Sequence, residues 1–183
     1  MISSLIALIF LRVGLRSLYK LVNHSYDVHD IDFYSLLLLK VNKVFEKNKD
    51  QPFFCYLSFN APHTPLQVPD QYYQMYKDTD PNQGIDPELL PRVPMSEKNK
   101  EDARKVYAMV SNIDDNLNKL FQKVEALGIE ENTIVIFMTD NGPQQPRYVS
   151  GMKGRKSSIY KGGIRDPFFI RYPPKYKGNQ EKE

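Results

Sequence analysis

The sequence predicts an α/β fold in which a mostly parallel sheet is flanked by helices. Two short apolar runs, Phe53–Phe59 and Thr133–Met138, lack polar–apolar alternation, which is typical of strands buried on both faces of a parallel sheet. A long amphipathic segment from about Asn99 to Leu127 lies between them, as a crossover helix would. The chain has 183 residues, 41% of them hydrophobic and 26% charged, which is enough for one globular domain with a core.

Two helices and one long loop complete the predicted order. Residues 33–48 are predicted to be helical because apolar residues recur at helical spacing, namely Leu37, Leu38, Val41, Val44 and Phe45. The helix at 99–127 has a longer stripe of the same kind, which Gly128 is placed to end: Val106, Met109, Val110, Ile113, Leu117, Leu120, Phe121, Val124 and Leu127. Residues 66–98, rich in proline and tyrosine, are predicted to be an ordered loop with one short helix near Asp70–Lys77.

The first 30 residues have no assigned place in this fold. Ile2–Leu11 is largely apolar, but about ten residues are too few to span a bilayer as a helix. No Lys or Arg precedes the run and no small-residue cleavage site follows it, so a signal peptide is not predicted. Arg12, Arg16 and Lys20 would share one face of a helix. Three interpretations stay open: an interfacial helix through which residues 1–22 contact a membrane, a helix displaced from its partner, and a misassigned start.

The single cysteine, Cys55, lies inside the first apolar run. One cysteine excludes an intrachain disulfide. We expect it to be buried as a small apolar side chain, so it does not indicate a redox compartment.

Positive charge is concentrated near the C-terminus, although the formal net charge is only +3. Within this region Asp166 is the only acid, and the cations are Arg147, Lys153, Arg155, Lys156, Lys161, Arg165, Arg171, Lys175 and Lys177. The cluster suits an anionic ligand, and a solvated charged surface is the alternative. No nucleic-acid-binding motif accompanies it, so nucleic acid is not an expected partner.

Polar residues follow both predicted strands. His63 lies in the proline-rich loop Asn60–Pro65, and Asp140 and Asn141 follow the second strand. Ligands bind open α/β sheets at the carboxyl ends of strands, and oxygen ligands such as these suit Ca²⁺ or Mg²⁺. An Asp-Asn-Gly turn and an exposed histidine without a role are the alternatives.

A glycine-rich basic segment, Gly151–Pro167, precedes another strand that begins at Phe168. Its glycines permit close backbone approach and its cations, among them Lys156, can neutralise an anion. The segment does not match the GxxxxGK[ST] phosphate-binding pattern, and a basic connector is the alternative.

Four segments in this order resemble the sulfatases of the alkaline phosphatase superfamily. They are the loop Asn60–Pro65, the helix with Asn112–Asp115, the turn Thr139–Pro143, and the run Lys156–Pro167. The resemblance covers roughly residues 33–174 and implies an alkaline phosphatase-like fold that is incomplete at the N-terminus. Residues 1–30 then form a segment of unclear status, and residues 31–183 form part of a sulfatase catalytic domain.

The resemblance also implies an activity and a site. It implies hydrolysis of a sulfate ester on a sulfated small molecule or glycan. His63 and Lys156, four residues before Tyr160, would contact the sulfate. Asp140 and Asn141 would help to hold a divalent metal, usually Ca²⁺. One departure is Lys161, which stands where the family usually has glutamate.

Other parts of the family's site are missing from this sequence. There is no Cys/Ser-x-Pro-Ser/Ala-x-Arg motif, whose first residue becomes the formylglycine nucleophile, and Cys55 does not fit it. Paired N-terminal aspartates and a Lys-x-His pair are also absent, so His24 and His29 are expected to be surface or structural residues. We therefore expect a fragment or incomplete gene model that is inactive alone.

Two other functions remain open. A phosphodiesterase or phosphatase of the same superfamily would need more Asp and His ligands for two metals. A noncatalytic module that binds sulfated glycans would need only a cationic surface, formed by Arg155, Lys156, Arg165 and His63. Members of the family are often exported or lysosomal, but the sequence assigns no compartment, oligomeric state or natural substrate.

Overall fold

The computed structural model describes residues 6–12, 18–22, 33–91 and 93–178. These residues fall into two compact units. The sheet unit takes its described residues from Ile6–Phe59, Asp115–Met138 and Phe168–Glu183. The loop unit takes its described residues mainly from Asn60–Asp114 and Thr139–Pro167.

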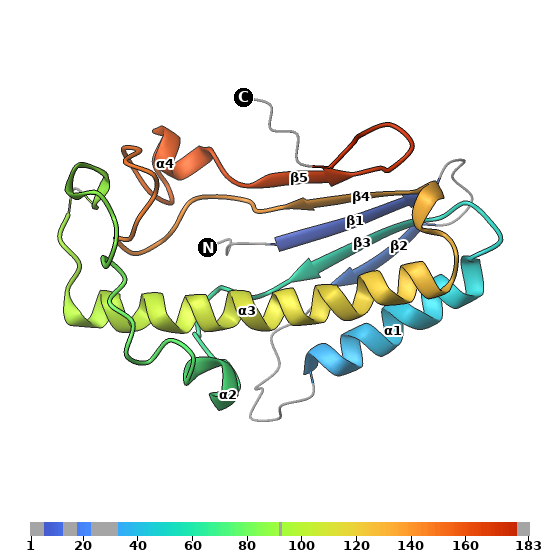
Figure 1. Ribbon diagram of the computed structural model, residues 1–183, viewed down its shortest axis with the longest axis horizontal. Helices are drawn as coiled ribbons and strands as arrows, with labels where there is room; N and C mark the ends of the chain where they lie inside the picture. Colours follow the sequence, from blue (N-terminus) through green and yellow to red (C-terminus); the bar gives the residue numbers. More distant parts are fainter. Residues whose placement is uncertain (1–5, 13–17, 23–32, 92, 179–183) are drawn as a thin grey trace. The chain divides into compact units, whose positions relative to one another are not determined.

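The sheet unit contains five strands in the order β2-β3-β1-β4-β5 (Figure 1). Their bounds are Ile6–Arg12 for β1, Leu18–Val22 for β2, Phe54–Phe59 for β3, Thr133–Met138 for β4 and Phe168–Arg171 for β5. β1 is antiparallel to both β3 and β4, and β5 is antiparallel to β4. The pairing of β2 with β3 is parallel. A mostly parallel sheet is therefore not confirmed, because the described strands form a mixed sheet.

The two predicted strands nevertheless point in the same direction. Since β3 and β4 each run antiparallel to β1, they run parallel to each other without being neighbours. The register places Ile6 opposite Phe59 and Ala7 opposite Met138. The carboxyl ends of β3 and β4 therefore lie at the same end of the sheet, as expected. The start of β1 lies between them.

The apolar run near the N-terminus is a strand, so the interpretation as an interfacial helix is wrong. Ile6–Arg12 forms β1, and Lys20 lies in β2, while Arg16, His24 and His29 lie outside the described residues. The run is rich in β-branched and aromatic residues, and between two strands its backbone groups find partners on both sides. Among the helices of the described residues, none is long and apolar enough to cross a membrane.

The predicted first helix is confirmed as α1 (Phe33–Asn48). Phe45 is fully buried and its ring centroid lies 5.5 Å from that of Phe53, just before β3. Asn48 is also buried, and its side-chain amide donates to the Val44 carbonyl at 2.6 Å. This bond gives the buried side-chain amide of Asn48 a partner within its own helix.

The long helix α3 spans Glu97–Ala126, close to the predicted range. At its start, Ser96 Oγ accepts a hydrogen bond from the Asn99 N–H at 3.2 Å, which is an N-cap interaction. At its end, Gly128 has a φ of +64° and donates its N–H to the Glu125 carbonyl at 2.8 Å. A 3₁₀ turn, Glu130–Asn132, then leads into β4.

The apolar stripe of α3 is narrower than the sequence predicted. Most of its members are buried, namely Val106, Met109, Ile113, Leu117, Leu120 and Val124. Val110 is 48% exposed and Phe121 is 36% exposed. Each follows a buried residue directly, which places it about 100° around the helix and at the margin of the buried face.

The helices in the described residues of segment 66–98 are short. They are α2 (Asp70–Tyr73), where a helix near Asp70–Lys77 was predicted, and a 3₁₀ turn at Pro87–Leu89. The Tyr76 hydroxyl lies 2.7 Å from Ser111 Oγ on α3, so the tyrosines of this segment anchor it to the helix.

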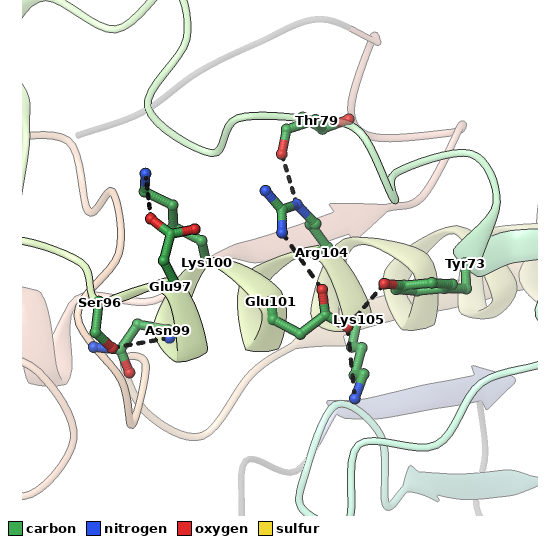
Figure 2. A network of polar contacts seen from close by, with 9 residues as sticks. All are labelled: Tyr73, Thr79, Ser96, Glu97, Asn99, Lys100, Glu101, Arg104 and Lys105. Carbon is green, nitrogen blue, oxygen red and sulfur yellow. Dashed lines mark hydrogen bonds and ion pairs between the residues drawn. The ribbon is translucent and has the colours of Figure 1, made fainter.

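A polar network joins the same segment to the first turns of α3 (Figure 2). The Tyr73 hydroxyl donates to Glu101 Oε1 at 2.8 Å, and this bond is the main reason that the pKa of Tyr73 is raised. Arg104 donates to the Thr79 carbonyl at 2.8 Å and to Glu101 Oε2 at 3.4 Å. The long loop is thus fixed by both hydroxyl and guanidinium groups.

Glycines allow backbone segments of the loop unit to pass very close to one another. A Cβ added at Gly142 would lie 2.0 Å from the Gly162 carbonyl oxygen. One added at Gly162 would lie 2.4 Å from the Gly154 carbonyl oxygen. Gly162 belongs to the short helix α4 (Lys161–Ile164), which carries part of the predicted anion-binding segment.

The burial of Cys55 leads to a prediction about its reactivity. Cys55 has no exposed surface, and burial raises its pKa to about 12. Because the thiolate is the reactive form, the folded protein should resist a disulfide reagent at pH 8 and react fully once unfolded in guanidinium. The release of the reagent's thiolate, followed by absorbance, measures this. Labelling of the folded protein as fast as of a free thiol would contradict the placement in β3.

The packing of Gly162 leads to a second prediction. Gly162→Ala should lower the free energy of unfolding by about 1–3 kcal/mol, because the contacted atoms are backbone and cannot move aside freely. Gly178→Ala is the matched control, since nothing lies within 4 Å of its added Cβ. Urea unfolding of both variants compares them with the parent protein. Equal stabilities would show that the segments are not packed this closely.

Candidate functional site

The residues after β4 are fixed by backbone hydrogen bonds to one other stretch of the loop unit. We call residues 139–143 the β4-end loop and residues 151–167 the basic loop. Thr139 donates its N–H to the Pro167 carbonyl at 3.3 Å, and Gly142 donates to the Gly163 carbonyl at 3.1 Å. The two loops therefore run alongside each other at both ends of the β4-end loop.

Lys156 is brought to the β4-end loop by its own backbone. Its N–H donates to the Pro143 carbonyl at 3.0 Å, and the residue is half-buried. Beside it the Ser158 hydroxyl accepts from the Arg155 N–H at 3.1 Å, and Ser157 has a φ of +68°. Lys156 thus lies in a tight turn whose backbone touches the segment that carries the predicted metal ligands.

Asp140 and Asn141 lie within the same β4-end loop. Asp140 is exposed and Asn141 is half-buried. The Asn141 side-chain amide donates to the Gly142 carbonyl at 3.0 Å, which fixes the orientation of its amide group. The two residues present a carboxylate and an amide oxygen at the start of a loop whose path is set by the neighbouring glycines.

Asp166 is a residue that the sequence reasoning did not assign to the site. Burial raises its pKa first, the carboxylate of Asp140 raises it further, and the Thr139 hydroxyl offsets part of the shift. Thr139 Oγ1 is nevertheless outside hydrogen-bond geometry, because it and Asp166 Oδ2 are both buried without a partner. The signal in the sequence was that Asp166 is the only acid of the basic cluster.

The oxygen atoms near the end of β4 are of the type that a hard cation such as Ca²⁺ binds, but they are few. Among the described residues, no three His, Cys, Asp or Glu side chains gather into a metal-binding group. Asp140 and Asp166 supply two carboxylates, and Asn141 adds an amide oxygen. The buried Asp166 Oδ2 without a hydrogen-bond partner is the atom that a cation would satisfy. Oxygen ligands of this kind are those that Ca²⁺ and Mg²⁺ bind.

His63 lies in the loop unit too, and its hydrogen bonds are within its own loop. Its N–H donates to the Asn60 carbonyl at 3.0 Å, and its ring Nδ1 contacts the Thr64 carbonyl. A carbonyl oxygen only accepts, so Nδ1 carries the proton and Nε2 is the ring atom left to meet a ligand. The convergence of His63 with Lys156 and Asp140 stays a prediction.

Arg147 differs from the exposed basic residues in its burial and in its hydrogen bonds. Burial lowers its pKa, whereas the charges of Tyr107 and Asp102 on α3 raise it. Its Nη2 donates to Gln145 Oε1 at 2.8 Å, and its Nε is buried without a partner. Arg147 therefore belongs with the packing of the loop unit against α3 and not with a solvated cationic surface.

The remaining cations of the basic loop are exposed. They are Lys153, Arg155, Lys161 and Arg165. Lys153 Nζ lies 3.9 Å from the centroid of the Tyr160 ring, which holds this ammonium over an aromatic face. Lys156 differs from them by its partial burial and its backbone bond to the β4-end loop.

Comparisons with known proteins identify the family of the chain. The family model for sulfatases matches residues 15–183. The uncharacterized sulfatase YdeN of Escherichia coli K12 is 32% identical over 142 residues, covering 74% of this chain and 22% of that protein. An endo-4-O-sulfatase of Bacteroides thetaiotaomicron is 29% identical over 134 residues, covering 70% of this chain and 25% of that protein.

Solved structures show the same likeness. Ps i-CgsB in complex with k-i-k-neocarrahexaose superposes with a TM-score of 0.59 at 27% identity, covering 77% of this chain and 28% of that one. A structure from work on glycosaminoglycan metabolism by Bacteroides thetaiotaomicron gives a TM-score of 0.65 at 26% identity, covering 78% and 30%. The chain thus spans only about a quarter of the curated relatives named above. Because the family model covers nearly all of the described sequence, this chain belongs to the sulfatase family.

Proposed function

We propose that this chain supplies the metal-side part of the active site of a sulfuric ester hydrolase that acts on a sulfated glycan or a smaller sulfate ester. The observation that carries the proposal is the hydrogen bond from the Lys156 N–H to the Pro143 carbonyl, which fixes the backbone of Lys156 beside the loop that contains Asp140 and Asn141. Membership of the sulfatase family supports the reaction class. The carrahexaose bound to one structural relative supports a glycan as substrate class.

Hydrolysis of a sulfate ester requires positive groups near the sulfuryl oxygens and a proton for the leaving oxygen. Hydrolysis breaks the bond between sulfur and the ester oxygen, and that oxygen leaves with the bonding pair and takes up a proton. Negative charge meanwhile sits on the sulfuryl oxygens, where fixed positive groups stabilise the transition state more than the ground state. A divalent cation, which we propose to be Ca²⁺ held by Asp140 and Asn141, would supply part of that positive charge.

The side chains of this chain supply the rest. The Lys156 ammonium binds a sulfuryl oxygen through a charge-assisted hydrogen bond. His63 Nε2 would contact the sulfate and could give a proton to the leaving oxygen. The glycines at 142 and 162 allow the backbone of the loop with the Asp-Asn pair to lie close to that of the basic loop, which contains Lys156.

The nucleophile is proposed to come from outside these 183 residues. They contain no Cys/Ser-x-Pro-Ser/Ala-x-Arg motif, and Cys55 is fully buried within β3. The expected property of the chain itself is therefore binding of a sulfate ester without turnover.

Binding of p-nitrophenyl sulfate to the 183-residue chain in excess Ca²⁺ tests this proposal by calorimetry. Lys156→Ala should weaken binding about tenfold or more, because a charge-assisted hydrogen bond is lost. Lys119→Ala, at an exposed position of α3, is the control and should match the parent protein. p-Nitrophenyl phosphate should bind more weakly than the sulfate.

Two results would contradict the proposal. Equal weakening by both lysine substitutions would mean that only bulk charge matters, and preference for the phosphate would point to another reaction of the superfamily. Binding that depends on Lys156 but is indifferent to Ca²⁺ would instead support the noncatalytic glycan-binding module.

A further inference from the structure

We infer that the turn Arg155–Ser158 positions Lys156 for its anion and that Ser158 is the positioning residue that holds this turn closed. The inference rests on the proposed function, in which the Lys156 ammonium binds the sulfate. The observations that carry it are the backbone conformation of the turn, the hydrogen bonds that Ser158 makes, and the packing of glycines around the Ser158 hydroxyl.

Residues 155–158 form a β-turn with a defined conformation. The Ser158 N–H donates to the Arg155 carbonyl at 3.0 Å, which is the bond between the fourth and first residues of a β-turn. Ser157, the third residue, has a φ of +68°, whereas the φ of Lys156, the second residue, is not positive. This combination is typical of a type II turn. Lys156 therefore occupies the second position of a turn whose backbone angles are restricted.

The third position of the turn carries backbone strain. Type II turns usually have glycine or asparagine there, because a Cβ crowds the backbone at positive φ. Ser157 is exposed, so burial of its own side chain does not offset this strain. Strained residues persist where the surrounding structure fixes them, and they are concentrated at functional sites. The groups that fix Ser157 must therefore be supplied by its neighbours.

Ser158 supplies two such groups. Besides the bond from its N–H, its Oγ accepts a hydrogen bond from the Arg155 N–H at 3.1 Å, so two bonds join the ends of the turn. Glycines leave room for the hydroxyl in this position. A Cβ added at Gly154 would lie 2.4 Å from Ser158 Oγ, and one added at Gly163 would lie 2.8 Å from it. The hydroxyl is thus enclosed by backbone that only glycine allows to come so close.

The closed turn fixes the backbone of Lys156 before a ligand arrives. The Lys156 N–H donates to the Pro143 carbonyl at 3.0 Å, so the middle of the turn is attached to the β4-end loop while Ser158 joins its ends. Lys156 is half-buried, and none of the ion pairs among the described residues involves it. A residue that is already ordered loses less conformational freedom on binding, which raises affinity.

Two substitutions at the exposed Ser157 test the role of the turn conformation, with calorimetric binding of p-nitrophenyl sulfate in excess Ca²⁺ as the measurement. Glycine adopts a positive φ without strain, so Ser157→Gly should bind within about twofold of the parent protein. Valine is β-branched and strongly disfavours this φ, so Ser157→Val should weaken binding about fivefold or more. Equal binding by the two variants would overturn the inference, because the conformation of the turn would then not matter.

Ser158→Ala tests the hydroxyl through a double-mutant cycle with Lys156→Ala. Loss of the bond from the Arg155 N–H should weaken binding about fivefold in the parent protein and have no effect once Lys156 is alanine. A serine with a merely structural role would weaken binding equally in both backgrounds, and that result would overturn the inference. Urea unfolding checks that each variant is folded. If Ser158→Ala does not fold, the comparison of the two Ser157 variants decides.

The same measurements separate this inference from the proposed function. Binding by Lys156→Ala that equals that of the parent protein would contradict the proposed role of the lysine, and the inference with it. Weaker binding by Lys156→Ala, together with unchanged binding by Ser158→Ala and Ser157→Val, would overturn the role of the turn alone and leave the proposed function standing.

Discussion

The candidate site depends on close backbone packing between the β4-end loop and the basic loop. Three hydrogen bonds define it, and glycines at 142 and 162 make the approach sterically feasible. This packing brings the backbone around Lys156 next to the loop that contains Asp140 and Asn141. A change in either backbone would therefore move the proposed cation ligands relative to the proposed anion ligand, without changing any charged group.

Much of the fold could be predicted because local pattern and final burial agree. The apolar runs of β3 and β4, the stripe of α3 and the cap at Gly128 each follow from residue type and spacing. The role of residues 6–12 could not be predicted in this way. A strand inserted antiparallel between two others is decided by the long-range pairing of backbone groups, which leaves no periodic signal in a short apolar run.

Some residues of the candidate site could be predicted from the sequence and others could not, for a similar reason. Asp140, Asn141, His63 and Lys156 stand in recognisable motifs next to predicted strands. The effect of Asp140 on Asp166 shows only in the structure, because the two residues are far apart in sequence. Arg147 shows the converse, because composition placed it in a cationic cluster, whereas in the structure burial lowers its pKa and the charges of Tyr107 and Asp102 act on it.

The central claim is that one anion and one cation share the space between Lys156 and the Asp140–Asn141 pair. A crystal structure of the chain grown with Ca²⁺ and an aryl sulfate tests it most directly. The account predicts Ca²⁺ at about 2.3–2.6 Å from Asp140 and a sulfate oxygen within about 3.2 Å of Lys156 Nζ, both belonging to the same bound complex. Lys156 directed to solvent on the far side of its turn, with Ca²⁺ and sulfate at unrelated places, would contradict it.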